Sequence, residues 1–400
     1  MRHFSFLGEE QISRLFHLRP QTISGDSSPE LLAAALGGTL YSPADRPQLA
    51  HDIAKQAARG CLSMVLCLED SIADSAVDAA ETNVVQTLEY FYEQDAPADG
   101  TSEGDIPMLF VRVRSPEQML RIAQRCGQAL DVLTGFVIPK FENRTGMAQR
   151  FLDALHCIHE LHGQAGSSGR RRLRIMPILE SRVMIHAETR AGVLAEILAV
   201  LQTNREDILA VRVGATDLSS AFGLRRSRDL TIYDVKVVAS IIADIVNVLG
   251  RSSDGFVISG PVWEHYANTE RLLRPMLRAT PFATTESSEL RHRILMANLD
   301  GLMREIGLDQ ANGLLGKTVI HPSHVPLVHA MSVVSHEEYV DAQEILGNSQ
   351  GGAAASPYGN KMNEMKPHQA WAAKTMLRAA AFGAAAVDVT YVELLEASMS

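Results

Sequence analysis

The segment Arg174–Asp217, RIMPILESRVMIHAETRAGVLAEILAVLQTNREDILAVRVGATD, decides the fold. Its first run, Arg174–Leu179, and its last run, Leu209–Val213, are almost continuously apolar, whereas a strand with one face in water would alternate polar and apolar residues. The stretch between the two runs, Arg182 to Asn204, has the pattern of a helix. The segment therefore predicts two parallel strands that are joined by a helix and covered on both faces.

The same unit recurs along the chain. Six further apolar runs bring the total to eight, and they are Gly38–Ser42, Met64–Leu68, Met108–Val113, Gly135–Pro139, Phe256–Ser259 and Lys317–His321. Helices are predicted in the gaps at residues 45–60, 79–94, 115–129, 146–162, 233–249, 288–306 and 335–346. Eight strand–helix repeats favour an α/β fold of the (β/α)₈ TIM-barrel type. A doubly wound open sheet ranks second, because no G-x-G-x-x-G follows the first strand.

Three segments lie outside the barrel that we expect over residues 37–346. Residues 1–36 form an N-terminal extension with one short helix around Glu9–Phe16. Residues 347–358 are rich in Gly, Ser and Ala, which predicts a flexible linker. Residues 359–400 contain a predicted helix from Pro367 to Phe382. This last segment can be a lid over its own barrel or a neighbour's, or a packing arm.

Composition excludes several classes of protein. The chain has 400 residues, 46% of them hydrophobic, and a formal net charge of −10, which disfavours nucleic acid as a partner. The four cysteines form no C-x-x-C pair, so reduced thiols and a cytoplasmic location are expected. The most apolar helix candidate, Val235–Val248, contains Lys236, Asp244 and Asn247 and is too short to span a bilayer.

Polar residues follow most of the predicted strands, where barrel enzymes carry their catalytic groups. Glu180 and Asp217 end adjacent strands, so their carboxylates can meet. Two carboxylates without a nearby Cys or His favour a hard cation such as Mg²⁺. The alternative is that each carboxylate pairs with a lysine or arginine of the barrel.

Arg112 ends the third predicted strand at the same rim. An arginine there can bind a substrate carboxylate and stabilise an enolate. It can also form an ion pair with Glu69 or Asp70, which end the second strand. The two roles are compatible, because such a pair also orients the arginine.

At these residues the sequence resembles the citrate lyase β-subunit-like family of aldolases and lyases, from about residue 38 to about residue 346. One motif accompanies almost every predicted strand, in order: Tyr41–Pro47, Leu68–Ile72, Val111–Val113, Ile138–Glu142, Pro177–Ser181, Gly214–Leu218 and Gly316–Pro322. Each motif alone is weak, and the seven together are specific.

The resemblance implies a TIM barrel, Mg²⁺ on Glu180 and Asp217, and substrate carboxylate or enolate on Arg112. It implies that Glu69 and Asp70 reach the metal through waters or brace the arginine. The expected substrate-binding groups are Arg46, the backbone amides of Gly214 and Ala215, and Thr216. Thr216 stands where the family has an acidic residue. Family members are trimers or larger, so a homo-oligomer such as a trimer or hexamer is expected.

Two regions depart from the family pattern. Glu364 stands where the family's C-terminal lid carries an acid–base aspartate, and it is adjacent to Asn363. The long connection 261–286 carries Trp263, His265 and Tyr266, and substrate choice is expected to sit there.

The main hypothesis is a Mg²⁺-dependent carbon–carbon lyase that acts on a small carboxylate or its acyl-CoA ester through an enolate. Two alternatives remain open. One is a TIM-barrel effector-binding component with little or no catalysis, and the other is an aldolase for free pyruvate or oxaloacetate.

Overall fold

Eight parallel strands form one sheet in the protein, in the order β8-β7-β6-β5-β4-β3-β2-β9. The structure is a computed structural model that describes residues 1–25, 27–95, 106–163, 172–266, 299–348 and 350–399. A further parallel bridge joins Gly260 to Lys317 and brings the two edges of the sheet together. The strands are β2 (Gly38–Pro43), β3 (Ser63–Cys67), β4 (Met108–Arg112), β5 (Leu133–Ile138), β6 (Arg174–Leu179), β7 (Val211–Val213), β8 (Ile258–Ser259) and β9 (Lys317–Val319). The prediction of a TIM barrel is confirmed.

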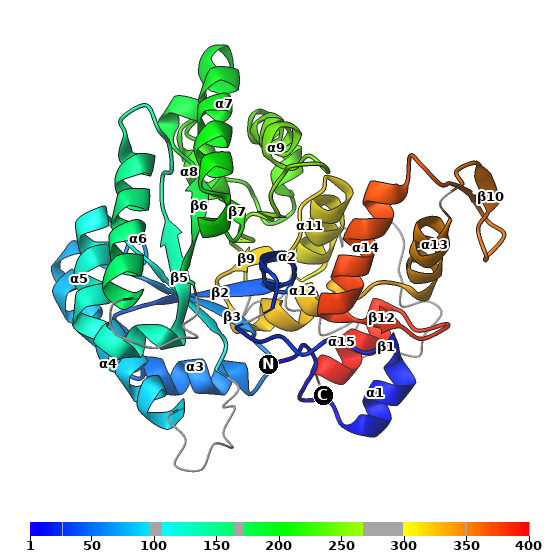
Figure 1. The fold of residues 1–400 in the computed structure, drawn as a ribbon, viewed down its shortest axis with the longest axis horizontal. Coiled ribbons are helices and arrows are strands. Elements are labelled where there is room, and N and C mark those ends of the chain that lie inside the picture. The colour runs from blue at the N-terminus through cyan, green and yellow to red at the C-terminus, as the bar shows by residue number, and fades with distance from the viewer. Residues whose placement is uncertain (26, 96–105, 164–171, 267–298, 349, 400) are drawn as a thin grey trace.

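Helices surround the barrel (Figure 1). They are α3 (Leu49–Ala57), α4 (Val77–Asp95), α5 (Pro116–Cys126), α6 (Met147–Gly163), α7 (Ala187–Thr203), α8 (Ala215–Ser220), α9 (Lys236–Leu249), α11 (Asp300–Ala311) and α12 (Val325–Ser332). Single turns of 3₁₀-helix lie at Asp74–Ala76, Arg182–Met184, Arg205–Asp207, Ile232–Asp234 and Pro322–His324, and a longer one at Gly127–Val132. Most of the predicted helix bounds agree to within a few residues. The start of the helix predicted at 288–306 lies outside the described residues.

One predicted helix begins late. The sequence predicts a helix from Asp45, but α3 begins at Leu49. The side-chain amide of Asn83, on α4, donates to the carbonyl oxygens of Ala44 and Arg46. These tertiary hydrogen bonds hold the strand-to-helix loop in a non-helical conformation, which a local sequence pattern does not reveal.

Each strand divides its side chains between two cores. Outward residues such as Leu66, Val111 and Ile138 pack against the helices. Inward residues such as Val65, Phe110 and Ile178 fill the barrel interior. The two sets alternate because successive side chains of a strand point to opposite faces. This alternation also determines which residues near a strand end face the cavity.

The two terminal segments of the chain pack on each other beside the barrel (Figure 1). Strand β1 (Phe16–Leu18) pairs antiparallel with β12 (Ala384–Ala385), and the ring of His3 stacks on Phe382 with centroids 4.2 Å apart. The remaining helices there are α1 (Glu9–Leu15), α2 (Pro29–Ala34), α13 (His336–Gly347), α14 (Gln369–Phe382) and α15 (Tyr391–Met399).

The segment predicted as a flexible linker contains a strand. Residues Ala353–Ala355 form β10, which pairs antiparallel with β11 (Met362–Glu364). The hairpin is anchored on α13, because Asp341 accepts hydrogen bonds from Ser356 and Asn363. This part of the chain is therefore tied to the C-terminal helices.

Across the described part of the chain, no helix combines the length and the apolar character needed to cross a membrane.

The tight packing of neighbouring strands gives a prediction for Gly135. A Cβ atom at this position would lie 1.7 Å from the carbonyl oxygen of Arg174 on β6. We therefore expect Gly135→Ala to lower the free energy of unfolding by about 3 kcal/mol or more, measured by urea denaturation. Gly307→Ala, on α11, is the matched control, because a Cβ there meets nothing within 4 Å. It should leave stability unchanged or raise it by up to about 1 kcal/mol. Equal effects of the two substitutions would contradict the packing argument.

Candidate active site

A cavity of about 370 Å³ opens at the carboxyl ends of the strands. Residues from five strands of the barrel and from the loops after them line it: Tyr41, Asp70, Arg112, Ile178, Glu180, Arg212, Val213, Gly214, Ala215, Thr216, Asp217, Arg225, Val262, Glu264, Thr318 and Ile320. Seven of the ten residues that the sequence indicated as site residues thus line this cavity. The barrel brings them together because parallel strands end at one rim.

Arg112, the last residue of β4, stands at the centre of the charged groups. Its Nη2 atom lies 2.6 Å from Glu69, 3.1 Å from Glu180 and 3.4 Å from Asp70. Burial lowers the pKa of Arg112, but the charges of Glu180 and Glu69 outweigh burial and raise it, so the guanidinium stays ionised. The buried Nε atom has no hydrogen-bond partner among the described residues. Part of this cation thus remains unsatisfied by the protein.

Glu69 connects Arg112 to Lys140. The Lys140 Nζ atom lies 2.6 Å from Glu69. Burial raises the pKa of Glu69, but the hydrogen bonds with Asp70 and Lys140 and the charge of Arg112 outweigh burial and lower the pKa to about 2. Asp70 responds in the opposite direction, because burial and the neighbouring Glu69 carboxylate both raise its pKa. Glu69 therefore stays ionised and braces the two cations.

Lys140 has an unusual backbone conformation, with a φ of +50°. Its backbone N–H donates to Glu180 over 3.2 Å while its side chain contacts Glu69. A left-handed residue other than glycine is strained, and such strain is concentrated at functional sites. Here the strained conformation aims one residue at two carboxylates.

Glu180 is buried at the end of β6 and is 5% exposed. Burial raises the pKa of Glu180 to about 7; the charge of Arg112 opposes this rise, and the charge of Asp217 adds to it. Residue 214, directly after β7, has to be glycine, because a Cβ there would lie 2.0 Å from Glu180 Oε2. One carboxylate oxygen of Glu180 thus contacts Arg112 and Lys140, and the other faces the gap that glycine leaves.

Asp217 lies in the first turn of α8, directly after β7. Its carboxylate makes no hydrogen bond or ion pair with any residue in the described ranges. The adjacent Thr216 donates a hydrogen bond of 2.7 Å to Glu264. The backbone N–H of Gly214 donates to the carbonyl of Leu179, so this amide is engaged in the sheet. Ala215 is the first residue of α8, so its backbone N–H has no acceptor within the helix.

The oxygen donors of the cavity suit Mg²⁺ better than a metal that needs several protein ligands. Within the described ranges no group of three or more His, Cys, Asp or Glu side chains could hold a metal ion. Mg²⁺ needs fewer protein ligands than that, since it keeps several waters and takes one or two carboxylates. A buried glutamate with a raised pKa and an aspartate without a partner, both on one cavity, fit such an ion.

Three predicted site residues do not line the cavity. Glu69 lies behind it, against Arg112, and the other two are farther away. Arg46 lies on the loop after β2, half exposed, and forms an ion pair of 2.6 Å with Asp52. Glu364 lies on β11, where its side chain is exposed. No described residue of 359–400 lines the cavity of its own chain.

Lys140, Tyr41 and Arg212 are among the residues of the site that were not assigned a role from the sequence. Lys140 lies in the motif Ile138–Glu142, and its position directly after a predicted strand was the available signal. Tyr41 and Arg212 line the cavity from β2 and β7. The signal for Arg212 was a lone charge inside an apolar run. Of the connection 261–286, only residues up to Tyr266 are described: Trp263 is buried under the Arg226 guanidinium, and the Tyr266 ring stacks on His321.

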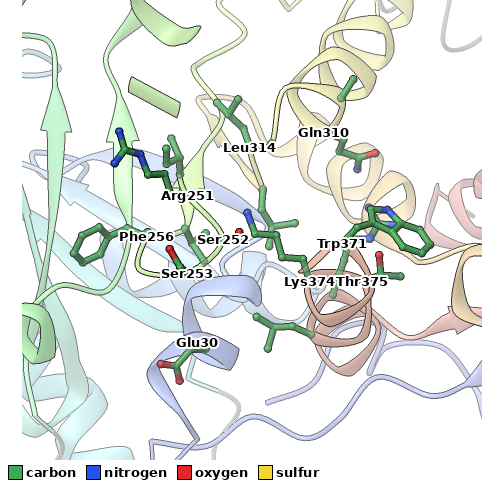
Figure 2. A pocket seen from close by; sticks show the side chains of 18 of the residues that line it. Glu30, Arg251, Ser252, Ser253, Phe256, Gln310, Leu314, Trp371, Lys374 and Thr375 are labelled. Atoms are coloured by element: carbon green, nitrogen blue, oxygen red, sulfur yellow. The ribbon is translucent and has the colours of Figure 1, made fainter. Parts of the chain in front are cut away.

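A second cavity of about 720 Å³ lies at the opposite end of the barrel, beside the loops that enter β8 and β9. Figure 2 shows Trp371, Lys374 and Thr375 of α14 on one side of it and Ser252 and Phe256 on the other. Its cations are engaged by the protein: Lys374 donates to the carbonyl of Gly250, and Arg378 pairs with Glu338. We therefore place the candidate active site in the cavity at the strand ends.

The comparison with known families agrees with this geometry. The model of the C–C bond lyase family of the TIM-barrel fold matches residues 30–384. The chain belongs to this family of carbon–carbon bond lyases, and the family resemblance in the sequence is confirmed. No curated protein matches the chain.

Solved structures that are similar to the chain share low sequence identity with it. A citrate lyase from Burkholderia xenovorans LB400 is 14% identical, with a TM-score of 0.58 over 90% of this chain and 96% of that one. CitE from Mycobacterium tuberculosis, in complex with magnesium, acetoacetate and coenzyme A, is 23% identical, with a TM-score of 0.49 over 87% and 99%. Haloferax volcanii malate synthase is 17% identical, with a TM-score of 0.50 over 73% and 72%.

The raised pKa of Glu180 predicts a pH dependence of stability. The folded protein holds this proton up to a pH of about 7, whereas the unfolded chain releases it near the ordinary value of 4.5. Glu180 therefore stabilises the fold below pH 4.5 relative to higher pH, and this contribution is lost as pH rises to 7. In metal-free buffer, the free energy of unfolding of the wild type should fall relative to Glu180→Gln by up to about 3 kcal/mol across this window. Denaturant titrations at several pH values measure it, and parallel curves for the two proteins would contradict the assignment.

Proposed function

We propose that the protein is a Mg²⁺-dependent carbon–carbon lyase that cleaves or forms a bond next to a carboxylate. Family membership supports lyase chemistry. The observation that carries the proposal is that Glu180, Asp217 and Arg112 line one cavity at the carboxyl ends of the strands. Its substrate would be a small hydroxy or keto acid, or the acyl-CoA ester of one.

Glu180 and Asp217 would hold the metal ion. When bound, Mg²⁺ would polarise the substrate oxygens and offset the negative charge that develops on them. Binding requires the ionised carboxylates, so Glu180 would have to lose the proton that burial favours.

The cations of the chain provide the rest of the electrostatic environment. Arg112 can grip a substrate carboxylate or the enolate oxygen that forms as the carbon–carbon bond breaks. Glu69 holds Arg112 and Lys140 in position through ion pairs of 2.6 Å with each. Because these side chains are already paired before substrate arrives, little reorganisation is needed during the reaction.

Cleavage also needs a base for the hydroxyl proton of the substrate. Glu364 is the carboxylate proposed for this role, and it does not line the cavity of its own chain. The role therefore requires a homo-oligomer, such as a trimer or hexamer, in which the segment 359–400 of one subunit covers the mouth of another barrel. A cytoplasmic location is part of the same proposal.

Removal of Asp217 tests the metal site. Saturating Mg²⁺ should raise the melting temperature of the wild type, by an amount equivalent to about 2.7 kcal/mol at a hundred times the dissociation constant. Asp217→Ala should lose this shift and lower turnover of a 2-oxo acid or acyl-CoA panel by several powers of ten. Glu188→Ala, at an exposed position on α7, is the control. Near-normal turnover in Asp217→Ala would refute the proposed metal ligands.

Mixing two inactive variants tests the shared site. Glu364→Gln and Asp217→Ala should each be inactive alone, because each lacks one part of every site. Co-expression should restore partial activity, since a mixed oligomer contains some barrels with an intact Asp217 covered by a segment with an intact Glu364. Turnover of the co-purified oligomer, with its mass by light scattering, is the measurement. An active Glu364→Gln variant, or no recovery in a confirmed mixed oligomer, would count against the role of Glu364.

A further inference from the structure

Arg212 lies inside the barrel, below the charged rim. On β7 it pairs in register with Ile178 of β6 and with Ser259 of β8. Glu180 and Gly214 follow these positions by two residues, so Arg212 faces the interior one layer deeper than they do. In the same layer of the interior, Ile178 belongs to the apolar core. A cation thus occupies an interior position beside the apolar core residue Ile178.

The guanidinium of Arg212 donates to neutral side chains. Nη1 donates to the Thr39 hydroxyl over 3.3 Å and to the Met176 sulfur over 3.8 Å, and Nη2 donates to the Thr318 hydroxyl over 2.7 Å. The guanidinium carbon lies 5.5 Å from the centre of the Tyr41 ring. The Nε atom of Arg212 and the hydroxyl of Ser259 are both buried and have no hydrogen-bond partner within the described ranges.

No carboxylate among the described residues forms an ion pair with Arg212. This isolation contrasts with Arg112, whose Nη2 atom contacts three carboxylates. Arg212 is only 1% exposed, and burial lowers its pKa against the opposing effect of Tyr41. Burial of a charge without a partner is costly, so proteins rarely keep such a group for stability alone. Within the described ranges, no negative charge balances the buried Arg212 guanidinium.

The cavity connects Arg212 to the proposed metal ligands. Arg212, Tyr41 and Thr318 line it together with Glu180, Asp217 and Arg112. Four carboxylates and three guanidiniums line the cavity in total, so a bound Mg²⁺ would leave a net charge of plus one. A ligand held at the rim therefore meets a second cation deeper in the same space.

We propose that Arg212, with Thr39, Thr318 and Ser259 around it, binds a second anionic group of the substrate. The substrate is then a short 2-oxo or 2-hydroxy acid that carries a second carboxylate, which reaches below the rim. The orientation of this substrate rests on the proposed function, in which Arg112 and the metal ion hold the other end of the substrate at the rim. Arg212 acts as a specificity-determining residue, since an acid with an apolar end would leave it without a partner.

The experiment compares two probes that differ only at one end. Oxaloacetate carries a second carboxylate where 2-oxobutyrate carries a methyl group. Isothermal titration calorimetry of the full chain, with and without Mg²⁺, should give tighter binding of oxaloacetate by about tenfold or more. Arg212→Met should remove this preference and keep the affinity for Mg²⁺ alone. Its melting temperature should equal or exceed that of the wild type, because an unpaired buried cation is replaced by an apolar side chain beside Ile178.

Two variants serve as controls. Arg59→Met, at an exposed position after α3, should keep the preference for oxaloacetate. Arg212→Lys keeps the charge and should keep part of the preference. Equal binding of the two acids by the wild type would overturn the proposal, and so would an undiminished preference for oxaloacetate in folded Arg212→Met. The comparison in the wild type remains a test even if Arg212→Met does not fold. A wild type that does not bind Mg²⁺ would count against the proposed function. In that case the titrations of the two acids without Mg²⁺ would still test the role of Arg212.

Discussion

The closure of eight parallel strands into a barrel is the constraint on which the rest of the structure depends. Closure fixes one face of every strand toward the interior, so the side chains near each strand end alternate between the cavity and the helix layer. Glu180 and Arg112 face the cavity for this reason, although they are 68 residues apart in the chain. The same rule places Lys317 on the outer side of its strand, where it is buried against Glu305 and Asp309 of α11. The Arg112 network and the Lys317 network thus lie on opposite faces of the barrel sheet.

Electrostatics at the rim follow from this geometry. Bringing Glu69, Asp70, Glu180 and Asp217 together is unfavourable unless cations offset their charges, and Arg112 and Lys140 provide that offset for Glu69 and Glu180. The offset is incomplete in two places. Burial keeps the pKa of Glu180 raised, to about 7, and Asp217 has no protein partner among the described residues. Arg212, below them, lacks a carboxylate partner in the same part of the chain. Ligands of the opposite charge would offset these imbalances, which supports the proposal that a metal ion and a substrate bind there.

The terminal segments leave the mouth of their own barrel open. The N-terminal extension and the C-terminal helices are held to each other by the β1–β12 pairing and by the stacked rings of His3 and Phe382. Helix α14 then lines the second cavity, at the far end of the barrel from Glu180 (Figure 2). No described residue of 359–400 lines the cavity at the strand ends of its own barrel, which supports the proposal that a second copy of the chain covers it.

The sequence by itself determined the barrel, the positions of most strands and helices, and the set of charged residues at the strand ends. Continuous apolar runs and helical periodicity are local patterns, and parallel topology sends every strand end to one rim. Tertiary structure decided the rest, because it depends on contacts between residues distant in the chain. Asn83 delays the start of α3, and Asp341 anchors a hairpin where the sequence indicated a flexible linker. Gly214 has its amide engaged in the sheet, and Glu364 lies away from the cavity of its own chain. The backbone conformation of Lys140 and the lack of a described carboxylate partner for Arg212 also depend on which residues the closed barrel brings together. A local sequence pattern does not predict those neighbours.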